Sequence, residues 1–203
     1  MWIMVGLDQW IAIDGREPLQ LPGQPSVREI GHLATRGLSG CVGLALGWEG
    51  GQIALAHVFS GCTDGTGKPP GPNTWDGPNG YRAKLDHALA MTQAAIPGAT
   101  EQKYRLGILV FSESDPTRTV ELLAGWLKDN GISSAQYPDW SGCNVSASPD
   151  DDDEMTVSKP SLLTNYLIAP VDDGLTWGPG GQMIACEELS ALAHSADPPQ
   201  GGT

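Results

Sequence analysis

The sequence predicts a single α/β or α+β domain, with a mixed, largely antiparallel sheet flanked by helices. Three observations support this fold class. Apolar runs typical of strands alternate along the chain with segments of helical periodicity. Two of these runs flank Gly50-Gly51, a pair typical of a β-hairpin turn. The hydrophobic fraction of 40% is sufficient for a packed core in a chain of 203 residues.

The expected strands are apolar runs bounded by glycine, proline or polar residues. Residues 2–7 and 10–13 are expected to pair with each other around Asp8-Gln9. The runs 38–46 and 52–59 are expected to form the hairpin that Gly50-Gly51 closes. The remaining expected strands are residues 104–111, 132–137, 162–169 and 182–186.

Helices are expected where apolar residues recur at helical spacing between capping and breaking residues. The expected helices are residues 27–36 after Ser26, residues 81–96, and the segment that begins at Asp115-Pro116 and ends at Asn130-Gly131. Proline and glycine predict loops at 15–26 and 60–80, and no helix or strand is assigned to residues 139–160, which contain the run Asp150–Glu154. We expect one domain over residues 1–195 and a disordered tail over 196–203.

The charge of the chain excludes several classes of partner. Lys and Arg number 11 and Asp and Glu 24, which gives a net charge of −13 and disfavours nucleic acid and anionic membranes. No apolar run approaches the roughly 18 residues of a membrane span, and the first residues lack the features of a secretory signal. The four cysteines are far apart and form no Cys-x-x-Cys pair, so we expect reduced thiols and no metal site.

Cys41 and His57 are the residues that predict chemistry. Folding the hairpin about its turn brings position 41 opposite roughly position 58, and paired Cβ atoms lie about 5 Å apart. A neighbouring imidazolium stabilises a thiolate, which is the nucleophilic form of cysteine. Gly40 permits close approach of a substrate, and backbone N–H groups of the 38–41 turn, with Ser39 and Gly40 as candidates, would form an oxyanion hole.

Two alternatives remain open from the residues alone. Cysteine is among the most buried residue types, and a histidine in a hairpin often satisfies only a core hydrogen bond. Cys41 and His57 would then be packing residues of a non-enzymatic binding module. A different hairpin register would instead make His32 the base, because a shift of one residue turns side chains to the other face.

The sequence around these residues resembles a known family. Leu38-Ser39-Gly40-Cys41, an apolar strand, a turn and a second strand ending in Ala56-His57 resemble the cysteine-dependent protein glutamine deamidases. That group includes the chemotaxis deamidase CheD, the catalytic domain of cytotoxic necrotizing factor and the Burkholderia lethal factor. Thr35 stands six residues before Cys41, where members of the group carry a catalytic threonine. The resemblance covers residues 35–59.

The resemblance implies a fold, an activity and a set of catalytic residues. The fold would be a β-sheet sandwich flanked by helices, and the activity hydrolysis of a glutamine side-chain amide of a target protein, without cofactor or metal. Cys41 would be the nucleophile, His57 the base and Thr35 the third member. A transglutaminase or a cysteine protease with the same dyad is the alternative enzyme.

The resemblance also bears on partners and location. The acidic chain favours a target protein with a basic face. The toxin-like Leu-Ser-Gly-Cys tetrapeptide favours an effector made in the cytoplasm and delivered into a host or competitor cell.

Other motifs predict no chemistry. Residues 61–69 partly match a phosphate-binding loop, but Cys62 replaces its first glycine and Pro69 its Ser or Thr, so we interpret them as an ordinary loop. Cys62 is interpreted as a spare loop cysteine. The run Asp150–Glu154 lacks the alternating ligands of a calcium loop and is interpreted as solvated charge.

Overall fold

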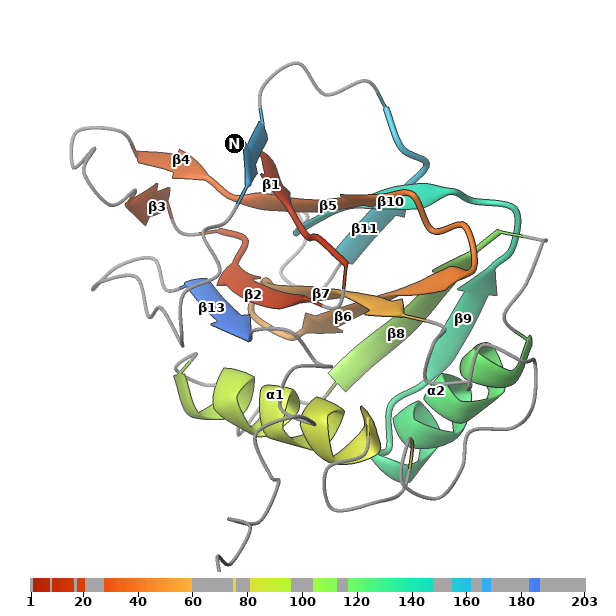
Figure 1. Ribbon diagram of the computed structural model, residues 1–203. Helices are drawn as coiled ribbons and strands as arrows, with labels where there is room; N and C mark the ends of the chain where they lie inside the picture. Colours follow the sequence, from red (N-terminus) through yellow and green to blue (C-terminus); the bar gives the residue numbers. More distant parts are fainter. Residues whose placement is uncertain are drawn as a thin grey trace, which may run out of the picture.

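The chain folds into three layers, two β-sheets and a pair of helices (Figure 1). The computed structural model describes residues 2–7, 9–16, 18–20, 28–59, 75, 81–95, 104–112, 117–147, 155–161, 166–168 and 183–186. Both sheets contain parallel and antiparallel pairs, and the helices cover one face of the larger sheet. The predicted α+β sandwich flanked by helices is therefore confirmed as a fold class.

Five strands form the sheet that lies away from the helices, here called sheet A. Their order across the sheet is β11 (Met155–Ser158), β10 (Gly142–Ala147), β5 (His32–Arg36), β1 (Trp2–Met4) and β12 (Tyr166–Ile168). Strand β1 runs parallel to both of its neighbours, whereas β10 runs antiparallel to β5 and β11.

Six strands form the central layer, here called sheet B. Their order is β13 (Met183–Cys186), β2 (Trp10–Asp14), β7 (Gln52–Phe59), β6 (Cys41–Trp48), β8 (Tyr104–Phe111) and β9 (Ser134–Tyr137). Only the β8–β9 pair is parallel. A separate two-stranded pair consists of β3 (Pro18–Gln20) and β4 (Arg28–Ile30).

The β6–β7 hairpin is the centre of sheet B and confirms the prediction of residues 38–46 and 52–59. Every residue of β6 is buried, because sheet A covers one face of sheet B and the helices cover the other. A strand buried on both faces has a continuous apolar sequence instead of an alternating one. Gly50 and Gly51 adopt φ angles of 95° and 89°, which other residues rarely adopt and which the turn requires.

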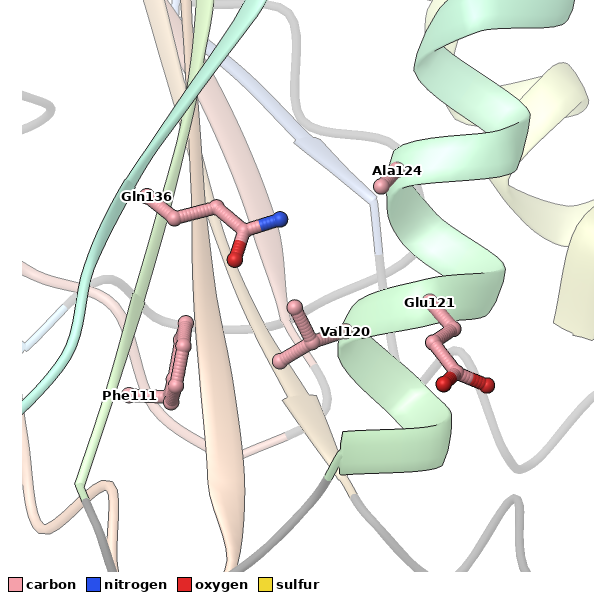
Figure 2. A pocket seen from close by; sticks show the side chains of 5 residues that line it. All are labelled: Phe111, Val120, Glu121, Ala124 and Gln136. Carbon is pink, nitrogen blue, oxygen red and sulfur yellow. The ribbon is translucent and has the colours of Figure 1, made fainter.

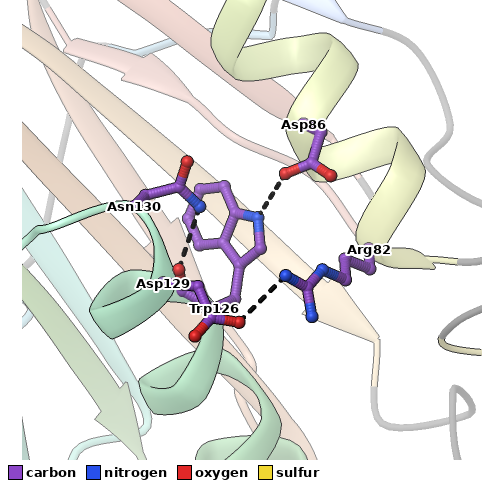
Figure 3. Close-up of polar contacts among 5 residues, drawn as sticks. All are labelled: Arg82, Asp86, Trp126, Asp129 and Asn130. Atoms are coloured by element: carbon purple, nitrogen blue, oxygen red, sulfur yellow. Dashed lines mark hydrogen bonds and ion pairs between the residues drawn. The ribbon is translucent and has the colours of Figure 1, made fainter.

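Helices α1 (Tyr81–Ala95) and α2 (Thr117–Asp129) pack on sheet B and on each other. The indole Nε1 of the buried Trp126 donates a hydrogen bond of 2.8 Å to Asp86 on α1, as Figure 3 shows. An exposed ion pair of 2.9 Å also joins Arg82 to Asp129. The exposed pair contributes little in water, so the bond that Trp126 makes to a carboxylate is the stronger link between the helices.

The end of α2 matches the prediction from Asn130-Gly131. Gly131 has a φ of 72°, and the N–H of Ile132 donates to the carbonyl of Leu127 at 2.9 Å. This is the backbone geometry with which glycine commonly ends a helix. The predicted start at Asp115-Pro116 lies outside the described residues.

The predicted helix over residues 27–36 is wrong, because the chain forms β4 and β5 there. Strand β5 lies in the interior of sheet A, paired with β1 on one side and β10 on the other. Leu33 and Ala34 have strand partners on both sides, and this pairing overrides a weak local helical pattern.

Two further expectations need correction. Residues 2–7 and 10–13 do not pair with each other, because β1 belongs to sheet A and β2 to sheet B. The expected loop over 15–26 contains β3, which pairs with β4. Strands β10 and β11 lie within residues 139–160, to which no element was assigned from the sequence.

The remaining expected elements are present within the residues described. They are α1, β8, β9, β12 and β13, which fall in the ranges 81–96, 104–111, 132–137, 162–169 and 182–186. The loop over 60–80, apart from Trp75, the run Asp150–Glu154 and the tail over 196–203 lie outside the described residues.

Candidate active site

The candidate catalytic residues lie between the two sheets, at one edge of the sandwich. A single row of paired residues crosses sheet B there, and its side chains share the face that sheet A covers. The row runs from Gln9, directly before β2, through one residue of each of β7, β6, β8 and β9, namely His57, Gly43, Val110 and Tyr137. Cys41 lies two residues before Gly43 on the same face of the sheet, at the first position of β6.

The hairpin register differs by one residue from the register expected from the sequence. Cys41 pairs with Phe59 instead of position 58, and His57 pairs with Gly43. The difference matters because a pairing of 41 with 58 would place Cys41 and His57 on opposite faces of the sheet. In the observed register Cys41 and His57 are diagonal neighbours on one face. The Cα atoms of such neighbours are about 7–8 Å apart, a separation within reach of long side chains. Both residues are 5% exposed.

Thr35 makes the hydrogen bond that the predicted triad requires. Its Oγ1 lies 2.9 Å from His57 Nδ1 and 2.9 Å from the backbone oxygen of Val5, and its side chain is fully buried. A hydroxyl has one proton, and a carbonyl oxygen only accepts. Both contacts are satisfied when Thr35 donates to Val5 and accepts from the Nδ1–H of His57. This arrangement favours the tautomer of neutral His57 whose Nε2 carries the lone pair.

Gly43 provides the space in which His57 and Thr35 meet. It is the residue of β6 directly opposite His57, and it has no side chain of its own. A Cβ atom at this position would lie 3.2 Å from Leu38 Cδ1 and 3.6 Å from Thr35 Cγ2. Side chains from the loop and from sheet A therefore already fill the volume that a larger residue would need.

The turn before Cys41 uses one of the backbone N–H groups that were expected to be available for an oxyanion hole. The backbone N–H of Cys41 donates to the carbonyl of Leu38 at 3.0 Å, so this donor is already used within the turn. Gly40 closes the turn with a φ of 73°, a conformation that glycine adopts without strain. Ser39 is exposed and Gly40 half-buried, so their N–H groups remain the candidates in this turn.

Arg36 holds the neighbouring strands of sheet A together behind Thr35. Its guanidinium donates to the carbonyls of Thr35 at 2.8 Å and Cys143 at 3.1 Å, and to the side-chain oxygen of Asn144 at 2.7 Å. The group of Thr35 that contacts His57 is its hydroxyl, whereas its carbonyl accepts a hydrogen bond from Arg36.

Cys143 lies opposite Thr35 on β10 and is fully buried. Burial raises the pKa of its thiol from 9.0 to about 12, and the charge of Arg36 opposes the shift only in part. Near neutral pH this thiol is therefore protonated and enclosed, which makes it a poor nucleophile.

The raised pKa of Cys143 predicts a pH-dependent stability. Between about pH 9 and 12 the unfolded chain loses this proton while the folded chain keeps it, so the free energy of unfolding falls as the pH rises. The contribution approaches about 1.4 kcal/mol per pH unit. We expect Cys143→Ala to flatten the decline in urea denaturation from pH 9 upward, because other titrating groups are common to both proteins. Equal slopes in both proteins would contradict the shift.

The structure separates the alternative base from the candidate site. His32 lies on β5 three residues before Thr35, so its side chain is on the other face of sheet A, where its ring lies 4.9 Å from that of Trp2. The His32 side chain therefore points away from sheet B, which carries Cys41. The alternative with His32 as the base is wrong. Cys62 lies outside the described residues.

Sequence reasoning missed the residues that connect the site to remote parts of the chain. The carbonyl of Val5 holds the Thr35 hydroxyl, and the carbonyl of Gln9 accepts the backbone N–H of His57 at 3.0 Å. Both contacts use backbone atoms, which leave no signal in residue type. Arg36 could have been found as a charged residue directly beside Thr35.

A separate cleft of about 400 Å³ lies on the other side of sheet B (Figure 2). Phe111 and Gln136 reach from the sheet toward Val120 on α2, and Ala124 and Glu121 complete the lining. Phe111 pairs with Val42, which belongs to the core under the helices, whereas Cys41 belongs to the core between the sheets. Sheet B therefore separates this cleft from the candidate site.

Comparisons with known proteins leave the sequence resemblance as it stood. Neither protein-family models nor curated proteins give a match to this chain. The relation to the glutamine deamidases thus stays a prediction from residues 35–59. Within the described part of the chain, no cluster of three or more metal-ligating side chains occurs, and no helix has the length and apolar character to cross a membrane.

Proposed function

We propose that this protein is a cysteine-dependent amide hydrolase that converts a glutamine side chain of a target protein to glutamate. The observation that carries the proposal is the hydrogen bond from His57 Nδ1 to a Thr35 hydroxyl whose own proton is donated to Val5. It leaves Nε2 as the proton acceptor of the imidazole, on the face of sheet B that also carries Cys41.

The proposed reaction has two halves. In the first, His57 Nε2 accepts the proton of the Cys41 thiol, the thiolate attacks the carboxamide carbon, and the oxyanion accepts hydrogen bonds from backbone N–H groups, for which Ser39 and Gly40 are the candidates. The protonated His57 gives its proton to the departing nitrogen, so that ammonia leaves and a thioester remains. In the second half neutral His57 accepts a proton from water as the water oxygen attacks the thioester carbon. The carbon–sulfur bond then breaks, glutamic acid is released and ionises to glutamate, and His57 returns its proton to the Cys41 sulfur.

The test compares wild type with Cys41→Ser on bacterial and eukaryotic lysate proteins. We expect wild type to convert one glutamine of a target to glutamate and to release ammonia, and Cys41→Ser to lose the activity by a factor of about 10³ or more. Mass spectrometry identifies the converted residue. Absence of any Cys41-dependent conversion would count against the proposal, and incorporation of an added primary amine would indicate a transglutaminase.

The low exposure of Cys41 and His57 favours one other candidate, a binding module in which both residues serve only packing. Thiol labelling distinguishes the two in the folded protein. An active-site thiol reacts with iodoacetamide near neutral pH faster than the enclosed Cys143, and His57→Ala slows that reaction. A Cys41 as inert as Cys143 would support the binding module.

A further inference from the structure

The large hydrophobic side chains exposed within the described part of the chain flank the candidate site. They are Leu7, which is 54% exposed, and Tyr137, which is 38% exposed. Leu7 lies in the connection that precedes Gln9 and β2, on one side of His57, and Tyr137 ends β9 on the other. Both side chains are therefore accessible to a partner molecule on either side of the candidate site.

Tyr137 belongs to a rigid aromatic pair. Its ring stacks on Trp140 with ring centroids 4.8 Å apart and an interplanar angle of 24°. The backbone N–H of Trp140 donates to Phe111 at 3.1 Å, and the carbonyl of Ser141 accepts from Leu38 at 3.0 Å. These bonds fix the aromatic pair to the end of β8 and to the turn that leads into Cys41.

The turn that carries the aromatic pair is strained. Asp139 has a φ of 68°, and no other residue except glycine adopts a positive φ within the described part of the chain. Such a conformation is costly for a residue with a Cβ atom and persists where the surroundings enforce it, commonly at functional sites. Lys159 Nζ lies 5.7 Å from the centroid of the Trp140 ring, so Trp140 already has a cation and an aromatic neighbour. Tyr137 is the ring of the pair that remains exposed.

We propose that Leu7 and Tyr137 dock an extended segment of a basic substrate protein beside Cys41, and that the Tyr137 ring binds a lysine or arginine side chain of that segment. This inference rests on the proposed function, because it assigns a substrate class to the same site. The net charge of −13 attracts a basic partner, and a cation stacks favourably on an exposed tyrosine ring.

The strand spacing predicts the position of the basic residue. Tyr137 and Gly43 are separated by one intervening strand, which places β9 about 10 Å from β6. An extended peptide advances about 3.3 Å per residue, so the cation is expected about three positions from the target glutamine. Leu7 lies on the opposite side of His57, where an apolar residue of the segment would contact it.

The test uses ten-residue peptides that carry a central glutamine and, three positions away on either side, arginine, leucine or glutamate. Wild type is expected to prefer the arginine peptides. Tyr137→Ala is expected to raise their KM about tenfold with little change in kcat, and to remove the preference over glutamate. Leu7→Ala is expected to raise KM for all three peptides. Tyr137→Phe keeps the ring and the preference, and His87→Ala, an exposed ring on α1, changes neither.

The two proposals fail in different ways. If wild type hydrolyses the peptides but Tyr137→Ala and Leu7→Ala leave KM and the charge preference unchanged, docking is wrong and the proposed function stands. If wild type hydrolyses none of the peptides, docking is tested by measuring the binding of labelled arginine, leucine and glutamate peptides to the Cys41→Ser protein. Tighter binding of the arginine peptide that Tyr137→Ala weakens supports docking, and equal or no binding overturns it. Iodoacetamide labelling of Cys41 is expected to be unchanged by Tyr137→Ala.

Discussion

Replacing Thr35 with valine is expected to reduce turnover by about 10²–10⁴-fold while the protein stays folded. Valine has nearly the shape of threonine, but it removes both hydrogen bonds of the hydroxyl, to His57 Nδ1 and to Val5. The imidazole then loses the group that selects its tautomer, and an incorrectly oriented base is far costlier to catalysis than to stability. The measurement is kcat, with the pH profile of kcat/KM, on the target identified by mass spectrometry.

The control variant and the stability of Thr35→Val make this prediction specific. Thr35→Ser keeps the hydroxyl and is expected to retain most of the activity. The valine variant leaves a buried carbonyl and a ring nitrogen without their partner, which costs about 1–3 kcal/mol, or roughly 2–4 °C in Tm for each kcal/mol. Full activity in Thr35→Val would remove the side chain from the catalytic machinery and leave Cys41 and His57 in place.

Replacing Gly142 with alanine is expected to destabilise the protein and damage the site together. A Cβ atom there would lie 3.0 Å from Arg36 Cα and still closer to the carbonyl oxygen of Thr35. These are backbone atoms of the paired strand β5, which cannot move aside as the end of a flexible side chain can. The strands must separate, at a cost of about 1–3 kcal/mol or more, and Thr35 is displaced from His57. Urea denaturation and turnover measure the two effects.

Gly125 provides a matched control for Gly142. It is an exposed residue in the interior of α2, and a Cβ atom there would meet nothing within 4 Å. Alanine is preferred over glycine in a helix by about 0.5–1 kcal/mol, so Gly125→Ala is expected to stabilise the protein and leave turnover unchanged. The same chemical change thus has opposite signs at the two positions. A Gly142→Ala protein as stable as wild type would show that β10 tolerates separation from β5.

Local sequence patterns predicted the part of the site that is local in sequence. Cys41 and His57 belong to one hairpin closed by Gly50-Gly51, so their proximity follows from turn chemistry with an error of one residue in register. That error is small in sequence and large in space, because each residue of a strand alternates its face. Only the contacts of the folded sheets select the register that brings both side chains to one face.

The position of Thr35 could not be derived from its own segment. Local periodicity favoured a helix over residues 27–36, and Thr35 was singled out only by its distance from Cys41 in the resembling family. Its strand forms because β1 pairs with it in parallel and β10 pairs with it from more than a hundred residues away. Such pairings depend on the whole sandwich and leave little trace in a short window of sequence.

Strand β10 lies late in the sequence but pairs with β5, so the timing of synthesis is relevant to the site. Residues up to His57, including Cys41 and Thr35, are made early, but β5 lacks one of its two neighbours until Gly142–Ala147 has been added. Contacts between segments this remote form late, and a domain of this kind folds as a unit. Under the proposed mechanism, a partly synthesised chain would carry its nucleophile and base without the strand that orders them. The producing cell would therefore meet an active thiol only after most of the domain has been made.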